Sequence, residues 1–257
     1  MLTKKRALVT GGSKGIGRSV ALALAEAGAD VAVSARTLPD LEAVVTNIES
    51  MGRRALALTC DVTDVAQVKR MAESILAEWG GLDILVNNAG NAQSHKFVTH
   101  PDEMWQRMLD VNLTSAYYVT KAFAPGMVER QWGRIINMAS IASKIGGRYI
   151  AAYAASKHGL LGLTRALALE FMDDHITVNA ICPGYVDTPM TDTTVENIKG
   201  KTGLSEEKAR EALAKTSPQR RLIDPEEVAA VAVLLSQEVS RGITGQAINV
   251  DGGAVMF

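Results

Sequence analysis

Short apolar runs alternate along the chain with longer stretches that repeat apolar residues at helical spacing. The apolar runs have the length of buried strands: Ala7–Thr10, Val31–Ala35, Ala55–Thr59, Ile84–Asn87, Arg134–Met138, Thr177–Ile181 and Ala247–Val250. Helices are predicted for Ile16–Ala25 and near Leu38–Met51, Val65–Trp79, Trp105–Val128, Tyr149–Phe171 and Pro225–Leu235. This alternation predicts an α/β fold, with a parallel sheet covered by helices on both faces.

The segment from Thr188 to Pro218 departs from this alternation. It is polar, charged and rich in Thr, Lys and Glu, and it follows a predicted strand. Ligands of open α/β sheets bind beyond the carboxyl ends of strands, so this segment is predicted to be a mobile lid over a substrate. The alternative is a plain surface excursion.

Length and composition narrow the class of protein. A chain of 257 residues with 47% apolar content can bury one substantial core, which favours one α/β domain. The formal net charge of −1, with dispersed Lys and Arg, argues against nucleic acid as a principal partner. No signal peptide or membrane span is expected, because the N-terminal residues lead straight into the first strand and no apolar run reaches ~20 residues.

The cysteines and histidines predict no disulfide and no metal site. Cys60 and Cys182 are the only cysteines, and each lies beside a strand-like stretch. Two buried thiols in a reducing cytosol are the ordinary interpretation, so a cytoplasmic location is expected. The four histidines lack the spacing of metal ligands.

A glycine-rich segment, Thr10–Gly17, lies between the first predicted strand and the first predicted helix. Its spacing is G-x-x-x-G-x-G, formed by Gly11, Gly15 and Gly17, rather than the common G-x-G-x-x-G. Glycines let a backbone turn tightly and approach a pyrophosphate, whose charge the free N–H groups of a helix attract. The segment predicts a dinucleotide site; the alternative is a glycine-rich turn without a ligand.

The end of the second predicted strand favours NADP(H) over NAD(H). An acidic side chain there would hydrogen-bond the adenosine ribose of NAD, but Ala35 and Arg36 occupy the region. Arg36 can grip a 2′-phosphate through its planar fork, with Lys14 supplying a second positive charge. Alternatively, both are solvated surface cations.

Tyr153 and Lys157 stand four residues apart on a predicted helix, so their side chains share one face. A free tyrosine has a pKa near ~10 and exchanges protons poorly at neutral pH. A lysine beside it is expected to favour the phenolate and to lower the tyrosine pKa. Alone, such a pair is usually an exposed accident; beside a phosphate loop it predicts acid-base catalysis.

Together these residues resemble the short-chain dehydrogenase/reductase family over nearly the whole chain. The family's markers occur in order: Thr10-Gly11-x-x-x-Gly15-x-Gly17, Asp61, Asn87-Asn88-Ala89-Gly90, Asn112, Ser140, Tyr153-x-x-x-Lys157 and Pro183-Gly184. The resemblance implies a single Rossmann-like domain spanning residues 1–257. It also implies a seven-stranded sheet of order 3-2-1-4-5-6-7 and, most commonly, a homotetramer.

The resemblance assigns four catalytic residues. Tyr153 would donate a proton to a carbonyl oxygen while the nicotinamide delivers hydride to its carbon. Ser140 would hydrogen-bond that oxygen, although outside this constellation it would be taken for a turn residue. Lys157 would hold the nicotinamide ribose, and Asn112 would hold a water that relays protons to Lys157. Without the family, Asn112 would be a helix-interior residue of no consequence.

The resemblance also assigns the cofactor contacts. Asp61 and Val62 would meet the adenine, and Asn88, Ala89 and Gly90 would line the adenosine side. Ser13 and Ile16 belong to the phosphate turn. The nicotinamide would be flanked by Pro183, Gly184, Val186 and Thr188, with Thr188 near its carboxamide.

The substrate is predicted from likeness rather than from a pocket. Residues 153–159, 176–190 and 245–253 resemble reductases of 3-oxoacyl thioesters carried on acyl carrier protein or CoA. Such carriers are anionic, so cations near the mouth of the cleft could attract them. The same cations could instead be ordinary solvated charges. They are Arg130, Arg134, Arg148, Lys199, Lys201, Arg220 and Arg221.

Two other functions remain open. One is a dehydrogenase or reductase of a free small alcohol or ketone, such as a 3-hydroxybutyrate, a polyol, a sugar or a cyclic alcohol. The other is a regulatory protein that senses a dinucleotide without chemistry. The intact Ser140, Tyr153 and Lys157 argue against the second.

Overall fold

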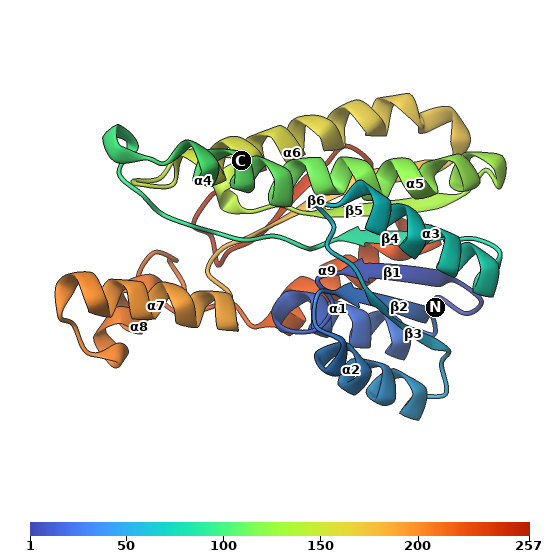
Figure 1. The fold of residues 1–257 in the computed structure, drawn as a ribbon, viewed down its shortest axis with the longest axis horizontal. Coiled ribbons are helices and arrows are strands. Elements are labelled where there is room, and N and C mark those ends of the chain that lie inside the picture. Colours follow the sequence, from blue (N-terminus) through green and yellow to red (C-terminus); the bar gives the residue numbers. More distant parts are fainter.

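The computed structural model describes residues 1–257 and contains one seven-stranded parallel sheet of order β3-β2-β1-β4-β5-β6-β7 (Figure 1). The strands are β1 Arg6–Thr10, β2 Asp30–Ala35, β3 Ala55–Thr59, β4 Ile84–Asn87, β5 Gly133–Met138, β6 Ile176–Pro183 and β7 Ala247–Val250. The predicted α/β class and the implied strand order are both confirmed. β6 runs beyond its predicted end because Cys182 and Pro183 pair with β7.

Nine α-helices connect the strands: α1 Gly15–Glu26, α2 Leu38–Ser50, α3 Val65–Trp79, α4 Asp102–Leu109, α5 Ser115–Glu129, α6 Ala151–Glu170, α7 Pro189–Thr202, α8 Glu206–Ala214 and α9 Pro225–Ser236. Helices α1, α2 and α9 pack on one face of the sheet in the largest hydrophobic cluster. Helices α3, α5 and α6 cover the other face (Figure 1). None of the helices has the length and apolar character needed to cross a bilayer.

The helix α3 shows how local sequence sets these elements. The Asp64 carboxylate caps its first turn by accepting from the backbone N–H groups of Ala66 and Gln67. Gly80, at a φ of 69°, ends it in the left-handed region that glycine tolerates. Val68 and Ile75 recur at helical spacing on its buried face, so sequence predicts both its bounds and its orientation.

The single helix predicted near Trp105–Val128 is wrong in one respect. The structure has α4 and α5 joined by a π-helical turn, Asp110–Thr114. A π-helical turn follows the i→i+5 hydrogen-bond pattern and is frequent at functional sites. Here it carries Asn112, which is 2% exposed. The apolar repeat of the flanking helices continues through the turn and therefore does not reveal it.

The polar segment 188–218 contains two helices that the sequence did not assign. Helices α7 and α8 form a hairpin that projects from the rest of the molecule (orange in Figure 1). The hairpin has a small hydrophobic cluster of its own, built on Val195, Ala209 and Leu213. So few buried residues leave almost no apolar periodicity, which is why composition alone suggested an irregular segment.

A buried chain of polar side chains ties α5 and α6 to the middle of the sheet. The Asn87 amide nitrogen on β4 donates to the Thr120 hydroxyl at 3.0 Å and to the Asn137 side-chain oxygen at 2.9 Å. The Asn137 nitrogen on β5 in turn donates to the Thr164 hydroxyl of α6 at 2.9 Å. All four residues are buried, so these bonds fix α6 against β5 by interactions that water cannot replace.

Replacing Thr164 by valine should therefore destabilise the protein. The substitution keeps the side-chain shape but removes the acceptor of a buried Asn137 N–H, at a cost of about 1–3 kcal/mol in the free energy of unfolding. Urea unfolding checks this, with Thr164→Ser, which keeps the hydroxyl, as the control. Equal unfolding free energies for the wild type and the valine variant would show that the bond contributes nothing.

Candidate active site

The loops that leave the carboxyl ends of the parallel strands meet at one edge of the sheet. A side chain on Gly90, after β4, would place its Cβ 3.6 Å from Lys157 Nζ on α6. A Cβ on Gly15, after β1, would lie 3.3 Å from the Thr188 side chain, after β6. Segments far apart in sequence therefore converge where open α/β sheets bind ligands.

The glycine-rich loop is held in a shape that requires its glycines. Gly11 and Gly15 have φ values of 64° and 55°, which side chains disfavour. A Cβ on Gly17 would lie 2.3 Å from the Gly11 carbonyl oxygen. The Asn88 amide donates to the carbonyls of Thr10, at 2.9 Å, and Gly11, at 3.1 Å. Asn88, expected to line the adenosine side, thus braces the loop through its side chain.

Sequence reasoning gave no separate role to Thr10. Its hydroxyl accepts from the backbone N–H groups of Asn88 and Ala89, at 3.0 and 3.1 Å. A threonine at the end of a strand next to the Asn88-Ala89 pair was the only available signal. With Asn88 it joins the β1 and β4 loops into one rigid unit.

This loop fits a pyrophosphate. Ser13 and Ile16 lie in it, and α1 begins at Gly15 without a side-chain cap on its first turn. The first N–H groups of a helix have no intrahelical acceptor and carry the positive end of its dipole. A bare glycine backbone with free donors is a cradle for an anionic dinucleotide.

Two cations lie beside this cradle. Arg36 directly follows β2, and Lys14 precedes α1; both are exposed. Neither side chain forms a hydrogen bond or an ion pair with the protein, although the Lys14 carbonyl accepts from the Arg18 N–H. Asp61, after β3, uses one carboxylate oxygen to accept from the Thr63 N–H and hydroxyl, and its other oxygen stays unbonded. Val62 is 6% exposed and packs into the core.

Ser140 follows β5 and caps the short turn Ile141–Ser143. Its hydroxyl oxygen accepts from the Ala142 N–H at 3.1 Å, while its backbone N–H donates to the Ser143 hydroxyl. The turn role therefore exists, but it uses the oxygen as an acceptor. The hydroxyl proton stays available for another oxygen, so the structural and catalytic interpretations of Ser140 are compatible.

Lys157 lies almost fully buried on α6, 5% exposed. Its Nζ donates to the Met138 carbonyl at 2.7 Å and lies 5.8 Å from the centre of the Tyr153 ring. Burial disfavours the charged form and lowers the Lys157 pKa to about 8. With a pKa of about 8, Lys157 still carries its proton at neutral pH, but it loses that proton more easily than an exposed lysine does.

The expected lowering of the Tyr153 pKa is not what the structure shows. Desolvation around the hydroxyl raises the pKa above its ordinary value, and contact with Ser140 offsets this only in part. Lys157 makes no opposing contribution, since its Nζ is turned to Met138 rather than to the phenol. Burial therefore sets the direction of the shift, and the protein by itself favours the protonated phenol.

Asn112 lies in the π-helical turn Asp110–Thr114, and its amide contacts the loop after β4. Its oxygen accepts from the Asn91 N–H at 3.0 Å, and its nitrogen donates to the Asn91 carbonyl at 2.9 Å. A Cβ on Gly90 would lie 2.8 Å from the same oxygen. Asn112 therefore pins this loop beside Lys157; its relay of protons through water stays a prediction.

The segment after β6 completes the edge. Pro183 ends the strand, and a Cβ on Gly184 would approach the Asp251 Cα to 3.1 Å. Val186 is buried in the main core, and Thr188 precedes the first turn of α7 against the glycine loop. The contacts of these four residues with a nicotinamide stay a prediction.

Arg130 and Arg134 were two of the cations considered for the mouth of the cleft, but neither lies near it. Arg130 contacts Leu82 and Asp83, which precede β4. Arg134 lies at the start of β5, only 1% exposed. Both are at the amino edge of the sheet, opposite the site. Of the other candidates, Lys199 and Arg221 pair with nearby glutamates, whereas Arg148, Lys201 and Arg220 form no ion pair.

A cavity near the start of α6 was not predicted from the sequence. It measures about 440 Å³ and is lined by His95, Phe97, Gly147, Arg148, Tyr149 and Ala151. The His95 N–H donates to the Tyr149 carbonyl at 2.7 Å and joins the loops after β4 and β5. Tyr149 has a φ of 68°, unusual for a non-glycine residue. The only sequence signal was that both loops leave the same edge.

Comparison with known proteins agrees with this geometry. A family model described as enoyl-(acyl carrier protein) reductase matches residues 11–255. D-beta-hydroxybutyrate dehydrogenase of Cupriavidus necator is 39% identical over 258 residues, covering 99% of each chain. The 3-oxoacyl-(acyl-carrier-protein) reductase FabG of Staphylococcus aureus (strain Mu50) is 35% identical over 257 residues, covering 100% of each.

Among solved structures, actinorhodin polyketide ketoreductase with NADPH superimposes with a TM-score of 0.95. It is 38% identical, and the match covers 100% of both chains. The similarity therefore extends over the sheet, the glycine loop and the α7–α8 hairpin alike. The chain belongs to the short-chain dehydrogenase/reductase family and is an oxidoreductase that acts on CH–OH or keto groups.

Proposed function

We propose that the protein is an NADP(H)-dependent reductase that interconverts a 3-oxoacyl thioester and its 3-hydroxyacyl form. The observation that carries the proposal is the convergence of Ser140, Tyr153 and Lys157 on the sheet edge that holds the glycine loop. Relatives named as ketoacyl and 3-oxoacyl reductases support the thioester. The dehydrogenase relative, equally similar, supports a free 3-hydroxy acid as the alternative substrate.

The protonation states suit reduction of a carbonyl. A Tyr153 pKa raised by burial keeps the phenol protonated at neutral pH, ready to give its proton to the alkoxide oxygen. The Ser140 hydroxyl, whose oxygen already accepts from Ala142, donates to the same oxygen as charge develops. A bound nicotinamide cofactor would supply the hydride to the carbonyl carbon. Lys157, with Asn112 holding the loop beside it, would hold the nicotinamide ribose and return a proton to Tyr153.

The cofactor preference rests on charge at the end of β2. Arg36 and Lys14 are exposed and unpaired, so neither must give up a protein partner to bind a phosphate. Asp61, the one carboxylate expected to meet the cofactor, follows β3 rather than β2, and its expected partner is the adenine. A solved relative was crystallised with NADPH. These features support a contact of both cations with the 2′-phosphate.

The α7–α8 hairpin is proposed to cover the acyl substrate. It begins at Thr188, against the glycine loop, and its core is separate from the main core. The cavity lined by His95, Arg148 and Tyr149 lies at the mouth, next to the first turn of α6 that carries Tyr153. Arg148 there has no protein partner and suits the anionic arm of a carrier protein or CoA.

Oxidation of NADPH by the purified protein tests the substrate. Acetoacetyl-CoA should be reduced, with a kcat/KM well above those for acetoacetate and simple ketones. Tyr153→Phe should lower kcat by about 10²- to 10⁴-fold, because it removes the acid while keeping the ring. Turnover of acetoacetate alone would favour the free-acid alternative, and an undiminished Tyr153→Phe variant would contradict the catalytic assignment.

Replacing Arg36 by aspartate should move the preference toward NAD(H). Loss of one charge-assisted contact to the 2′-phosphate should weaken NADP(H) binding by roughly ten- to a hundredfold. The measurement is kcat/KM for NADPH and NADH in the wild type and the variant. Arg165→Asp, a change of an exposed arginine on α6, is the matched control. An NADPH/NADH ratio equal to the wild type would refute the role of Arg36.

Burial of Lys157 should make stability depend on pH. Its pKa falls from 10.5 to about 8 in the folded protein, so above pH 8 the unfolded chain binds more protons than the folded one. The penalty of burying the charge is full below pH 8 and is relieved as pH rises toward 10.5. Relative to Lys157→Met, the wild type should gain on the order of 2–3 kcal/mol of unfolding free energy across that window.

Urea unfolding at pH 7.5 and at pH 10 (buffers chosen to bracket about pH 8) measures this difference. Lys69→Met, an exposed lysine on α3, controls for the loss of one lysine. A difference between wild type and Lys157→Met that does not change with pH would show that Lys157 titrates as it does in the unfolded chain.

A further inference from the structure

The α7–α8 hairpin joins the main core at its base. Val186 and Ile223, which flank the hairpin, pair as a short parallel bridge. The Ile223 N–H donates to the Tyr185 carbonyl and the Asp187 N–H donates to the Ile223 carbonyl, both at 2.9 Å. Val186 and Ile223 are buried in the main core, whereas the hairpin packs on its own small cluster. The base at Val186 and Ile223 is therefore a hinge, and the α7–α8 hairpin beyond it is a separately packed unit.

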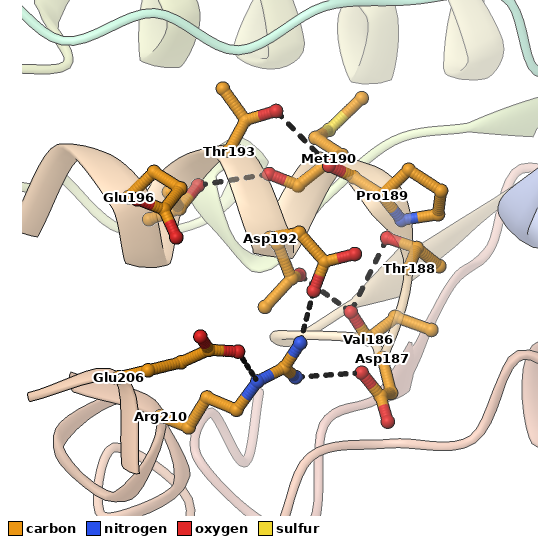
Figure 2. Close-up of polar contacts among 12 residues, drawn as sticks. Val186, Asp187, Thr188, Pro189, Met190, Asp192, Thr193, Glu196, Glu206 and Arg210 are labelled. Carbon is orange, nitrogen blue, oxygen red and sulfur yellow. Dashed lines mark hydrogen bonds and ion pairs between the residues drawn. The ribbon is translucent and has the colours of Figure 1, made fainter. Parts of the chain in front are cut away.

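One side chain of the outer helix reaches back to this base. Figure 2 shows Arg210 of α8 between Asp187, beside the hinge, and Asp192 and Glu206 of the hairpin. Its Nη1 donates to Asp187 at 3.0 Å, its Nη2 pairs with Asp192, and its Nε lies 3.6 Å from Glu206. The planar fork of arginine allows these contacts at once, which a lysine could not match.

The charges around Arg210 do not balance without it. Three carboxylates, Asp187, Asp192 and Glu206, surround one guanidinium. Lys199 reaches Glu206 at 3.6 Å but neither aspartate. Removing the positive charge of Arg210 would leave Asp187 and Asp192 as like charges with no cation between them. All four side chains remain partly exposed, so the latch is weak enough to open and close.

The latch acts next to the cofactor-binding edge. Asp187 precedes Thr188, whose side chain lies against Gly15 of the glycine loop. The hydroxyls of Thr188 and Thr191 both donate to the Val186 carbonyl, at 3.4 and 2.5 Å. A movement of Asp187 therefore also moves this short hydrogen-bonded segment, which lies against the glycine loop.

We propose that Arg210 is a positioning residue that latches α8 to the end of β6 and so holds the hairpin in place over the site. With the latch closed, Thr188 stays against the glycine loop and the hairpin covers the acyl substrate. The claim that the hairpin covers an acyl substrate rests on the proposed function. The claim that Arg210 holds the hairpin, and Thr188 against the glycine loop, does not.

Kinetics of Arg210→Gln test the substrate part. The probe is the acetoacetyl thioester of N-acetylcysteamine, a neutral molecule, so that a change in KM does not come from lost attraction for an anion. KM should rise about three- to tenfold with kcat within about twofold, the effect of a partly exposed ion-pair network. Arg210→Lys keeps the charge and loses the planar fork, so its KM should lie between those of the wild type and Arg210→Gln.

Lys215→Gln is the matched control, since Lys215 pairs with Glu211 on the same helix but reaches no other element. Asp187→Asn should raise KM like Arg210→Gln, and the double variant should be no worse than either. Unchanged KM in Arg210→Gln, or effects of the two changes that simply add, would overturn the latch.

Hydrogen exchange of the protein without substrate tests the hairpin part. Backbone amides of residues 189–214 should exchange faster in Arg210→Gln than in the wild type or Lys215→Gln, with the sheet unchanged. Equal exchange would overturn the latch. If the wild type reduced no thioester, the proposed function would fail, and faster exchange in Arg210→Gln would still support the latch.

Discussion

The close approach of Gly17 to the Gly11 carbonyl, braced by the Asn88 amide, is the contact on which the site depends. It locks the β1 loop, the start of α1 and the β4 loop into one unit. β1 and β4 are neighbours in the sheet, yet α1 packs on one face and the helices after β4 pack on the other. The chain thus divides at this point and leaves an opening that the glycine backbone lines.

Across that opening, burial decides the chemistry. It lowers the pKa of Lys157 and raises that of Tyr153, so both groups are driven toward their neutral forms. A protonated phenol beside a free Ser140 hydroxyl is arranged to give protons rather than to take them. The buried polar chain from Asn87 to Thr164 holds α6, and the carbonyl of Met138 receives Lys157, so the cost of burial is offset by fixed partners.

Two irregular features of the backbone lie where the site is built. The π-helical turn presents Asn112 to the loop after β4, and Tyr149 adopts a positive φ where it receives the His95 N–H. The hairpin beyond Thr188 is joined to this rigid framework through a short bridge and one arginine. The helix-covered sheet and the α7–α8 hairpin are therefore separately packed parts of one chain.

The sequence by itself determined the strands, their parallel arrangement and the residues of the glycine loop, because strand and helix periodicity and glycine spacing are local properties. The order of motifs placed Ser140, Tyr153 and Lys157 on one site. Only the tertiary structure decided that Asn88 braces the loop, that Arg130 and Arg134 lie at the far edge, and that the Tyr153 pKa rises. Each depends on burial or on neighbours distant in sequence, which no local pattern contains. The α7–α8 hairpin was hidden for the same reason, since three buried residues and one network of long-range ion pairs define it.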